Sequence, residues 1–429
     1  MKSPGITGTG ISVRIGKAIA EAKIPSSRFA GMVGPSPKPT NKSFRFLLEE
    51  ALSNPWGGKR LAELADRKRN VLILLDDATR PTPTAEILDS VLPRLHSAGV
   101  GRDQIQVLFA TGTHRAVSES EAQKKIGKER WKTLAWKSHD WKGPLVRMGR
   151  TSTGVPVDVN PALAEADLVI GIGSVFPHRY CGWSGGGKLV LPGASGEEAI
   201  AKTHLHPAFE PSITFGSRNN PAIAESREAA RIAGLKFLVQ VVSDGCGNVA
   251  AVEAGEPEKA HEAAIEHAIQ ILSAEVPISE IVVASAWPED SDLWQAGKAL
   301  YPAESVVKTG GVIILAASLE EGIGPHPEFP LLLKEKIEGP PVFAGKTTGT
   351  IALAAALMTK KVKEKAEILL VAEGPGAKLA GEVAKKAGFR FASSLQSALD
   401  DSLRRFPEGK IAVLKEAPLL LPVPKEGKA

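Results

Sequence analysis

The feature that most constrains the fold is a repeated alternation of a short apolar strand, a polar loop and a helix. The segments 71–75, 105–110 and 168–172 are almost wholly apolar, as strands buried on both faces are. Each is followed by a loop, and the first two loops lead into a helical pattern. This alternation predicts an α/β fold with a mostly parallel sheet covered by helices.

Two predicted helices begin with residues typical of helix starts. Thr82 and Pro83 fit an N-cap and a first helical position, for a helix that runs to about Ala98. Ser118 and Glu121 have the spacing of a capping box.

The chain has 429 residues, and at roughly 100–200 residues per domain we expect two domains. An amphipathic helix over 256–274 ends just before Val276 and Pro277, which indicates a boundary there. We predict two α/β domains, 1–274 and 275–429, with the last strand or the tail free to return to the N-terminal domain. The strands expected in the second domain are 281–284, 311–315, 368–371 and 411–414.

Composition narrows the environment and the partners. The net charge is +5 with both signs mixed along the chain, so nucleic acid is not an expected partner. Only two cysteines occur, Cys181 and Cys246, which favours a reducing cytoplasm over a disulfide framework. The first residues, MKSPGITGTG, contain no apolar h-region, and no stretch reaches the ~18 apolar residues of a membrane span, so we expect neither export by that route nor a membrane location.

Reactive side chains follow three of the predicted strands. Asp77 and Arg80 follow the first, His114 follows the second and His178 follows the third. Taken singly, an aspartate there is often a turn residue, and most loop histidines have no chemical role. Ligands bind beyond the carboxyl ends of parallel strands, and all four of these side chains follow such strands. Their joint placement therefore predicts one site.

The segment Gly182 to Lys188 has the G-x-x-x-x-G-K spacing of a phosphate-binding loop. Leu189 stands where such a loop needs Ser or Thr for magnesium, which weakens a nucleotide-hydrolase interpretation. We therefore expect a flexible glycine run that lets the main chain approach a ligand closely, with one lysine at its end. His204 and His206 lie i, i+2, which is not the usual spacing of a metal pair, although a zinc site formed with His178 stays open.

A second cluster lies in the predicted C-terminal domain. Asp292 and Gln295 fit an N-cap and the N3 position of a capping box. Trp294, Gln295 and Lys298 share one helix edge, which is suited to a carboxylate under an aromatic wall. A core tryptophan beside a solvated lysine is the alternative.

These segments together resemble the lactate racemase family, whose members use a nickel-pincer nucleotide. The resemblance spans both domains, and the spacings of ten residues from His178 to Lys188 and sixteen from Lys188 to His204 match the family pattern. The matching segments are 77–81, 111–114, 178 with 184–188, 204 and 293–298. The resemblance implies an isomerase, a racemase or epimerase of a 2-hydroxy acid, with its active site in the cleft between the domains.

The resemblance also implies a cofactor and its contacts. The cofactor is a pyridinium-3,5-bisthiocarboxylic acid mononucleotide that carries Ni(II), attached at Lys188, with His204 as the metal ligand. His206 has no family role. The residues implied in cofactor binding besides Lys188 are Asp77, Ala78, Thr79 and Arg80, and those implied in substrate binding are Arg80, Trp294, Gln295 and Lys298.

The chemistry fits this assignment. Inverting a 2-hydroxy acid through a carbanion would create a dianion, whereas hydride removal to a pyridinium avoids that charge. A base is needed on each face of the substrate, and the family places His114 and His178 there. The lactate-specific pattern has tyrosine where this chain has Trp294, so the resemblance fixes the reaction class and leaves the 2-hydroxy acid open.

The expected partners are a small 2-hydroxy acid and the enzymes that make the cofactor. Two alternatives to the racemase are a phosphate-loop nucleotide hydrolase and a non-catalytic carrier of the pincer nucleotide.

Overall fold

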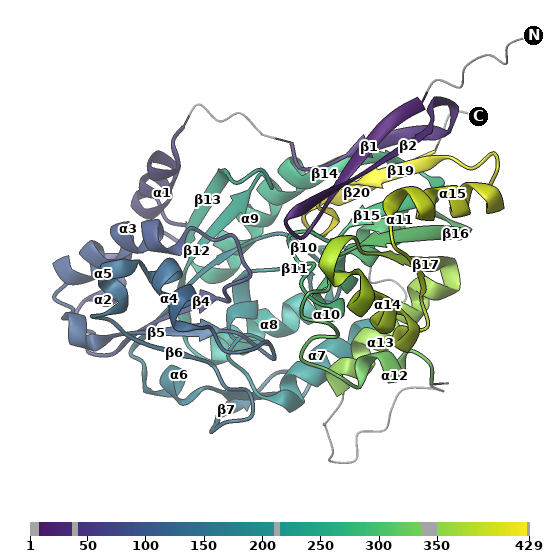
Figure 1. The fold of residues 1–429 in the computed structure, drawn as a ribbon. Coiled ribbons are helices and arrows are strands. Elements are labelled where there is room, and N and C mark those ends of the chain that lie inside the picture. The colour runs from purple at the N-terminus through teal and green to yellow at the C-terminus, as the bar shows by residue number, and fades with distance from the viewer. Residues whose placement is uncertain (1–7, 37–41, 210–214, 336–349, 427–429) are drawn as a thin grey trace, which may run out of the picture. The chain divides into compact units, whose positions relative to one another are not determined.

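The computed structural model describes residues 8–36, 42–209, 215–335 and 350–426, which form two compact units (Figure 1). The described residues of the central unit run from Ser36 to Ile271, and those of the terminal unit are the chain up to Pro35 and the part from Leu272 onward. The division near residue 271 lies close to the predicted boundary at 274. The first 35 residues, however, belong with the C-terminal part and not with the N-terminal domain where we placed them.

The central unit contains a six-stranded sheet in the order β13-β12-β9-β4-β5-β6. All neighbours are parallel except the antiparallel pair β12 and β13. Chain order reverses between β4 and β9, the topological switch point where α/β sheets of this kind bind ligands. The strands are β4 Val71–Asp76, β5 Ile105–Ala110, β6 Ala135–Ser138, β9 Leu168–Ser174, β12 Leu235–Ser243 and β13 Val249–Gly255.

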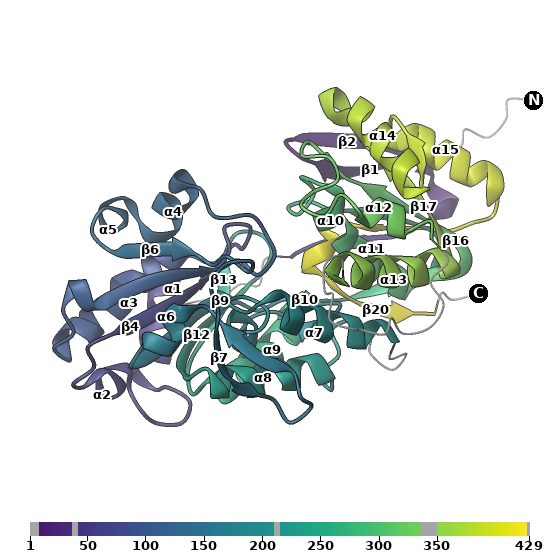
Figure 2. The same cartoon turned by 90° about the horizontal axis from the view of Figure 1, so that it is seen from below.

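Helices cover this sheet, as Figure 2 shows. Apolar side chains of α1 to α4 pack with alternate residues of β4, β5, β9 and β12 in one buried core. The helices are α1 Phe44–Ser53, α2 Leu61–Ala65, α3 Thr84–Ser97, α4 Glu119–Ile126, α5 Lys128–Trp131, α6 Pro161–Glu165, α7 Glu197–Phe209, α8 Pro221–Ile232 and α9 Pro257–Leu272. Two small hairpins complete the unit: β7 Val146–Arg150 with β8 Pro156–Val159, and β10 Pro177–His178 with β11 Gly182–Trp183.

The strands predicted in this half of the chain are confirmed, and so is the capping box of Ser118 and Glu121. The predicted role of Thr82 is wrong. Helix α3 begins two residues later, at Thr84, and the Thr82 hydroxyl instead donates a hydrogen bond to the buried Asp76. The helix predicted over 256–274 ends at Leu272, because the next residues form a strand.

The terminal unit contains a second six-stranded sheet, all parallel, in the order β18-β17-β16-β15-β19-β3. It confirms the four strands predicted after residue 275 and adds two. The strands are β3 Phe29–Val33, β15 Ser279–Ser285, β16 Val307–Ala316, β17 Ala366–Val371, β18 Arg390–Ala392 and β19 Ile411–Leu414. The helices are α10 Leu293–Ala296, α11 Leu300–Val306, α12 Phe329–Leu332, α13 Thr350–Lys365, α14 Ala377–Ala387 and α15 Leu395–Arg405.

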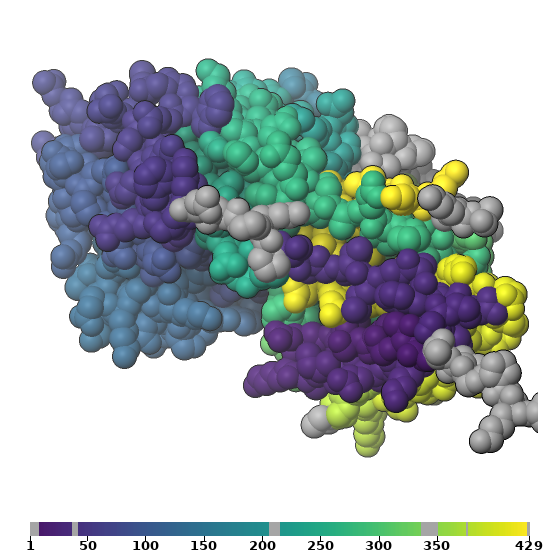
Figure 3. Space-filling model, turned by 90° about the horizontal axis from the view of Figure 1, so that it is seen from above, coloured from purple at the N-terminus to yellow at the C-terminus, as the bar shows by residue number. Residues whose placement is uncertain are grey.

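Both ends of the described chain contribute to the terminal unit. The hairpin β1 Gly8–Ile15 and β2 Ala18–Pro25 buries alternate apolar residues in the core of this unit, and β3 pairs with β19. In Figure 3 the purple N-terminal residues accordingly lie beside yellow C-terminal ones. Strand β20 Leu421–Lys425 pairs with β14 Ser273–Pro277, so neither the last strand nor the described tail joins the central unit. Among the described residues, no helix is long and apolar enough to cross a membrane.

Candidate active site

A cavity of about 110 Å³ lies in the central unit at the carboxyl ends of β4, β5 and β9, beside the switch point of the sheet. It brings together six residues that the sequence singled out. These are Asp77, Arg80, His114, His178, Lys188 and His204. The three loops predicted to meet at one sheet edge therefore do so.

Asp77 organises one side of the cavity. Its carboxylate accepts hydrogen bonds from the Thr79 amide at 2.8 Å and from His114 Nδ1 at 3.0 Å, and Arg80 Nε lies 3.7 Å away. Burial raises the pKa of the Asp77 carboxyl, but the charges of Arg80 and His114 and these hydrogen bonds outweigh it, so the pKa lies well below its usual value. Asp77 is therefore ionised and orients His114. Ala78 and Thr79 belong to the same loop but do not line the cavity.

Arg80 is held through both its side chain and its backbone. Its guanidinium lies over the ring of Phe176, 4.7 Å from the ring centroid, and its backbone carbonyl accepts a hydrogen bond of 2.8 Å from Lys125 Nζ. A planar guanidinium fixed in this way is suited to bidentate binding of a carboxylate.

A buried ion pair fixes the loop that carries Asp77 and Arg80. Lys125 Nζ lies 3.2 Å from Asp76 Oδ1, and both side chains are about nine-tenths buried. The other oxygen of Asp76 accepts hydrogen bonds from Thr82 and from the Ser174 amide, so Asp76 joins the ends of β4 and β9. Sequence reasoning missed this pair.

Replacing Lys125 with methionine should lower the free energy of unfolding by about 3 kcal/mol, because it leaves the Asp76 carboxylate buried without its counter-ion. Denaturant unfolding of the purified protein measures the change. Lys124→Met is the matched control, since Lys124 is the exposed neighbour on the same helix. Equal stability of the two variants would contradict a structural role for the pair.

His178 lies in the tight hairpin of β10 and β11. Its Nδ1 accepts a hydrogen bond of 3.3 Å from the Cys181 amide, so the proton of the neutral ring is on Nε2. The ring of Tyr180 packs between two site histidines, with centroids 5.8 Å from His178 and 4.8 Å from His204. Sequence reasoning did not find Tyr180.

The glycine run before Lys188 is not the flexible segment that we expected. Gly186 and Gly187 are buried, and each faces another part of the protein. A Cβ on Gly186 would lie 2.2 Å from His261 Nδ1, and one on Gly187 would lie 2.3 Å from the Ser226 carbonyl oxygen. The residues are glycines because the backbone packs closely against protein. The run ends in a 3-10 turn, Gly186–Leu189, without the long helix that follows a phosphate-binding loop, which removes the support for the hydrolase alternative.

His204 has the properties of a metal ligand. Its Nδ1 donates a hydrogen bond of 2.8 Å to the Ile200 carbonyl, which leaves the lone pair on Nε2. Burial and the charge of Lys188 lower the pKa of His204 to about 4, so the ring is neutral at pH 7. The side chain of His206 lies outside the described residues. Within the described part of the chain, no three His, Cys, Asp or Glu side chains converge as a metal cluster.

The second cluster of the sequence forms in the terminal unit. Asp292 caps α10 by accepting from the Gln295 amide at 2.8 Å. The capping box is incomplete, because the Gln295 side-chain oxygen accepts instead from Lys298. Lys298 also forms an ion pair with the buried Glu289, a partner that the sequence did not indicate.

Trp294 packs in an aromatic cluster. Its ring contacts those of His326 and Phe329, with centroid distances of 4.2 Å and 5.5 Å. Trp294 is thus part of a cluster of three aromatic rings, while the predicted carboxylate site between Trp294 and Lys298 stays a prediction.

Comparison with known proteins identifies the family. The profile of the lactate racemase N-terminal domain matches residues 15–216, a range that contains every residue of the cavity. Lactate racemase of Thermoanaerobacterium thermosaccharolyticum is 30% identical over 322 residues, which are 73% of this chain and 75% of that protein. The chain belongs to the lactate racemase family. A second member, lactate racemase of Lactiplantibacillus plantarum, is 32% identical over 317 residues, which are 72% of this chain and 74% of that one.

Solved structures agree with this family membership. The lactate racemase apoprotein of T. thermosaccharolyticum superposes with a TM-score of 0.85 at 26% identity, over 97% of this chain and all of that one. A Thermotoga maritima protein of 19% identity, with a TM-score of 0.68 over 89% of this chain and 99% of that one, shares the fold. The two-unit α/β architecture is thus that of the lactate racemase family.

Proposed function

We propose that this protein is a racemase or epimerase that inverts C2 of a 2-hydroxy acid. The observation that carries the proposal is the convergence of two histidines, one arginine, one lysine and one neutral histidine on a single cavity. Membership of the lactate racemase family supports the reaction class.

Each of the two proposed acid–base residues uses its Nδ1 for a hydrogen bond within the protein, which leaves Nε2 for the substrate. Asp77 accepts from His114 Nδ1, so neutral His114 carries a lone pair on Nε2 and acts as a base. His178 Nδ1 accepts from the Cys181 amide, so Nε2 of His178 is the nitrogen that exchanges a proton with the substrate. One histidine, in its neutral form, would take the hydroxyl proton of one enantiomer, while the other, in its protonated form, would return a proton to form the opposite one. Racemisation in the reverse direction exchanges the two roles.

The cavity suits a nickel-pincer nucleotide. Lys188 would hold the group covalently, and His204, with its Nε2 lone pair, would be the protein ligand to nickel. When bound, its pyridinium ring supplies a hydride acceptor. Arg80 would bind the substrate carboxylate, and Asp77 would keep both Arg80 and His114 in place. The assigned roles of Ala78 and Thr79 in cofactor binding, and of Trp294, Gln295 and Lys298 in substrate binding, stay predictions.

An isotopic experiment tests the reaction class. With a 2-deuterated 2-hydroxy acid and protein co-expressed with cofactor-making enzymes, deuterium should stay on Cα during racemisation, because a transferred hydride does not exchange with water. A two-base carbanion route would lose the label to solvent. NMR or mass spectrometry of the product measures retention. Rapid wash-out would contradict hydride transfer even if both histidines proved essential.

Replacing His204 with alanine should lower bound nickel while the organic group stays attached, because only the metal bond is removed. Elemental analysis and intact mass of the same sample measure the two quantities. Lys202→Ala is the control, since Lys202 lies on the same helix and pairs with Glu198 instead of lining the cavity. Equal nickel content in both variants would contradict the assignment.

A further inference from the structure

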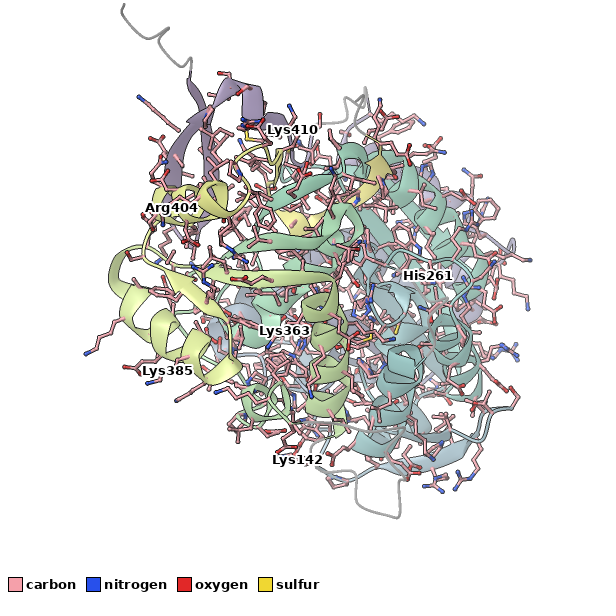
Figure 4. The ribbon with its side chains drawn as sticks, turned by 90° about the vertical axis from the view of Figure 1, so that its right-hand side faces the viewer. Lys142, His261, Lys363, Lys385, Arg404 and Lys410 are labelled. Atoms are coloured by element: carbon pink, nitrogen blue, oxygen red, sulfur yellow. The ribbon has the colours of Figure 1, made fainter. Side chains whose placement is uncertain are left out.

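His261, labelled in Figure 4, is a buried histidine that the chemistry above does not use. It lies on α9, far along the chain from the cavity loops, and is 1% exposed. Its Nε2 donates a hydrogen bond of 2.8 Å to the carbonyl of Ser184, four residues before Lys188. Its other ring nitrogen, Nδ1, faces Gly186 and has no hydrogen-bond partner among the residues that the structure describes.

Ser184 belongs to the segment that leads into the turn before Lys188, and we call residues 184–188 the Ser184–Lys188 turn. A second buried residue, on another element, also binds this turn. Gln240 on β12 is fully buried, and its side-chain oxygen accepts a hydrogen bond of 2.7 Å from the Gly186 amide. Its amide group donates at 3.1 Å to the Val239 carbonyl, which fixes the orientation of the side chain. Two adjacent points of the turn, the Ser184 carbonyl and the Gly186 amide, are therefore bound by side chains of α9 and β12.

The unpartnered Nδ1 indicates why position 261 holds a histidine. A buried nitrogen without a partner costs free energy, so an apolar residue would be favoured if this position served packing alone. The bond to Ser184 offsets that cost. Burial also lowers the pKa of His261 to about 4, which keeps the ring neutral at pH 7 and lets it act as a hydrogen-bond donor without a buried charge.

Close contacts with Gln240 and His261 explain why residues 185 and 186 are glycines. A Cβ on Gly185 would lie 2.2 Å from the Gln240 side-chain oxygen, and a Cβ on Gly186 would lie 2.2 to 2.6 Å from three atoms of the His261 ring. Both glycines also have positive φ angles, +76° and +58°. The turn can therefore pack against Gln240 and His261 only because residues 185 and 186 have no side chain.

We propose that His261 and Gln240 are positioning residues that fix the backbone of the Ser184–Lys188 turn and so aim the Lys188 side chain into the cavity. This role rests on the proposed function only in one respect, namely that Lys188 is the attachment point of the cofactor. The fixed turn itself is a property of the protein without any bound group.

The test compares His261→Phe, which keeps a ring but has no donor, with His261→Gln, whose amide restores one. In the protein without cofactor, backbone amides of the peptide around Gly186 and Lys188 should exchange with deuterium roughly tenfold faster in His261→Phe, the effect expected for one lost buried hydrogen bond. His261→Gln should lie close to the unsubstituted protein. His267→Phe is the matched control, since His267 is half-exposed on the same helix and pairs with Glu253.

Unchanged exchange in His261→Phe would overturn the proposal. Equal acceleration in His261→Phe and His261→Gln would also overturn it, because only packing would then matter. If His261→Phe does not fold, exchange is measured in Gln240→Leu instead, which removes the hydrogen bond to the Gly186 amide. Unchanged exchange in that variant would also overturn the proposed positioning role.

A second readout is the fraction of protein carrying an adduct on Lys188 after co-expression with cofactor-making enzymes, by intact mass. It should fall in His261→Phe and recover in His261→Gln. An unsubstituted protein that never carries an adduct would contradict the proposed function, while the exchange result would still decide the positioning role.

Discussion

Replacing either His114 or His178 with alanine should slow interconversion of the two enantiomers by ~10²–10⁴-fold in both directions, the usual cost of a lost general acid or base. Each histidine is needed both ways, because the base for one enantiomer is the acid that completes the other. Initial rates from each pure enantiomer, followed by chiral chromatography, measure the effect. The equilibrium constant must stay unchanged.

The two variants should also differ from a substitution that only disturbs the surface. His267→Ala removes a half-exposed histidine of the central unit and is expected to keep its rate. A variant of His114 or His178 that lost activity in one direction alone would violate the equilibrium constraint and so indicate a faulty assay. Full activity of either variant in both directions would refute the two-histidine assignment.

Replacing Lys188 with alanine should abolish covalent retention of the cofactor and with it all racemase activity. Among the described residues lining the cavity, Lys188 is the one lysine, so no other amine there can take its place. Intact mass after co-expression with cofactor-making enzymes should show the adduct in the unsubstituted protein and in Lys142→Ala, which changes an exposed lysine, but not in Lys188→Ala.

Peptide mapping adds a direct check of the attachment point. Lys188→Arg keeps the positive charge but lacks the primary amine that a thioamide needs, so it should fail in the same way. An adduct mapped to a different residue, or one that persists in Lys188→Ala, would disprove the attachment. Retention without turnover in the unsubstituted protein would favour the carrier alternative.

The central sheet could be predicted because its strands leave a strong local signal. A strand buried on both faces needs apolar residues in succession, as in 71–75 and 105–110, and ligands bind at the loops beyond the carboxyl ends of such strands. The same reasoning found His114 and His178. It could not find Lys125 or His261, because each is identified by a partner distant in sequence, Asp76 or Ser184.

The glycine run shows where local reasoning fails. Consecutive glycines suggest either flexibility or close approach, and the sequence does not say to what. The atoms that a Cβ would approach most closely at Gly185, Gly186 and Gly187 belong to Gln240, His261 and Ser226, all more than thirty residues away along the chain. The placement of the first 35 residues failed for the same reason, since β3 has its pairing partner at Ile411–Leu414.

The pairing of β3 with β19 has a consequence for synthesis on the ribosome. The described residues of the central unit form one continuous stretch of chain, 36–271, which has emerged long before β19, whereas β3 must wait for nearly the whole polypeptide before it meets β19. During that interval the hairpin and β3 expose apolar residues and strand edges that invite aggregation. A fragment that covers residues 36–271 should therefore be the best choice for producing the central unit by itself. A fragment that covers 1–271 would still carry β1 to β3, which would lack the sheet that they join.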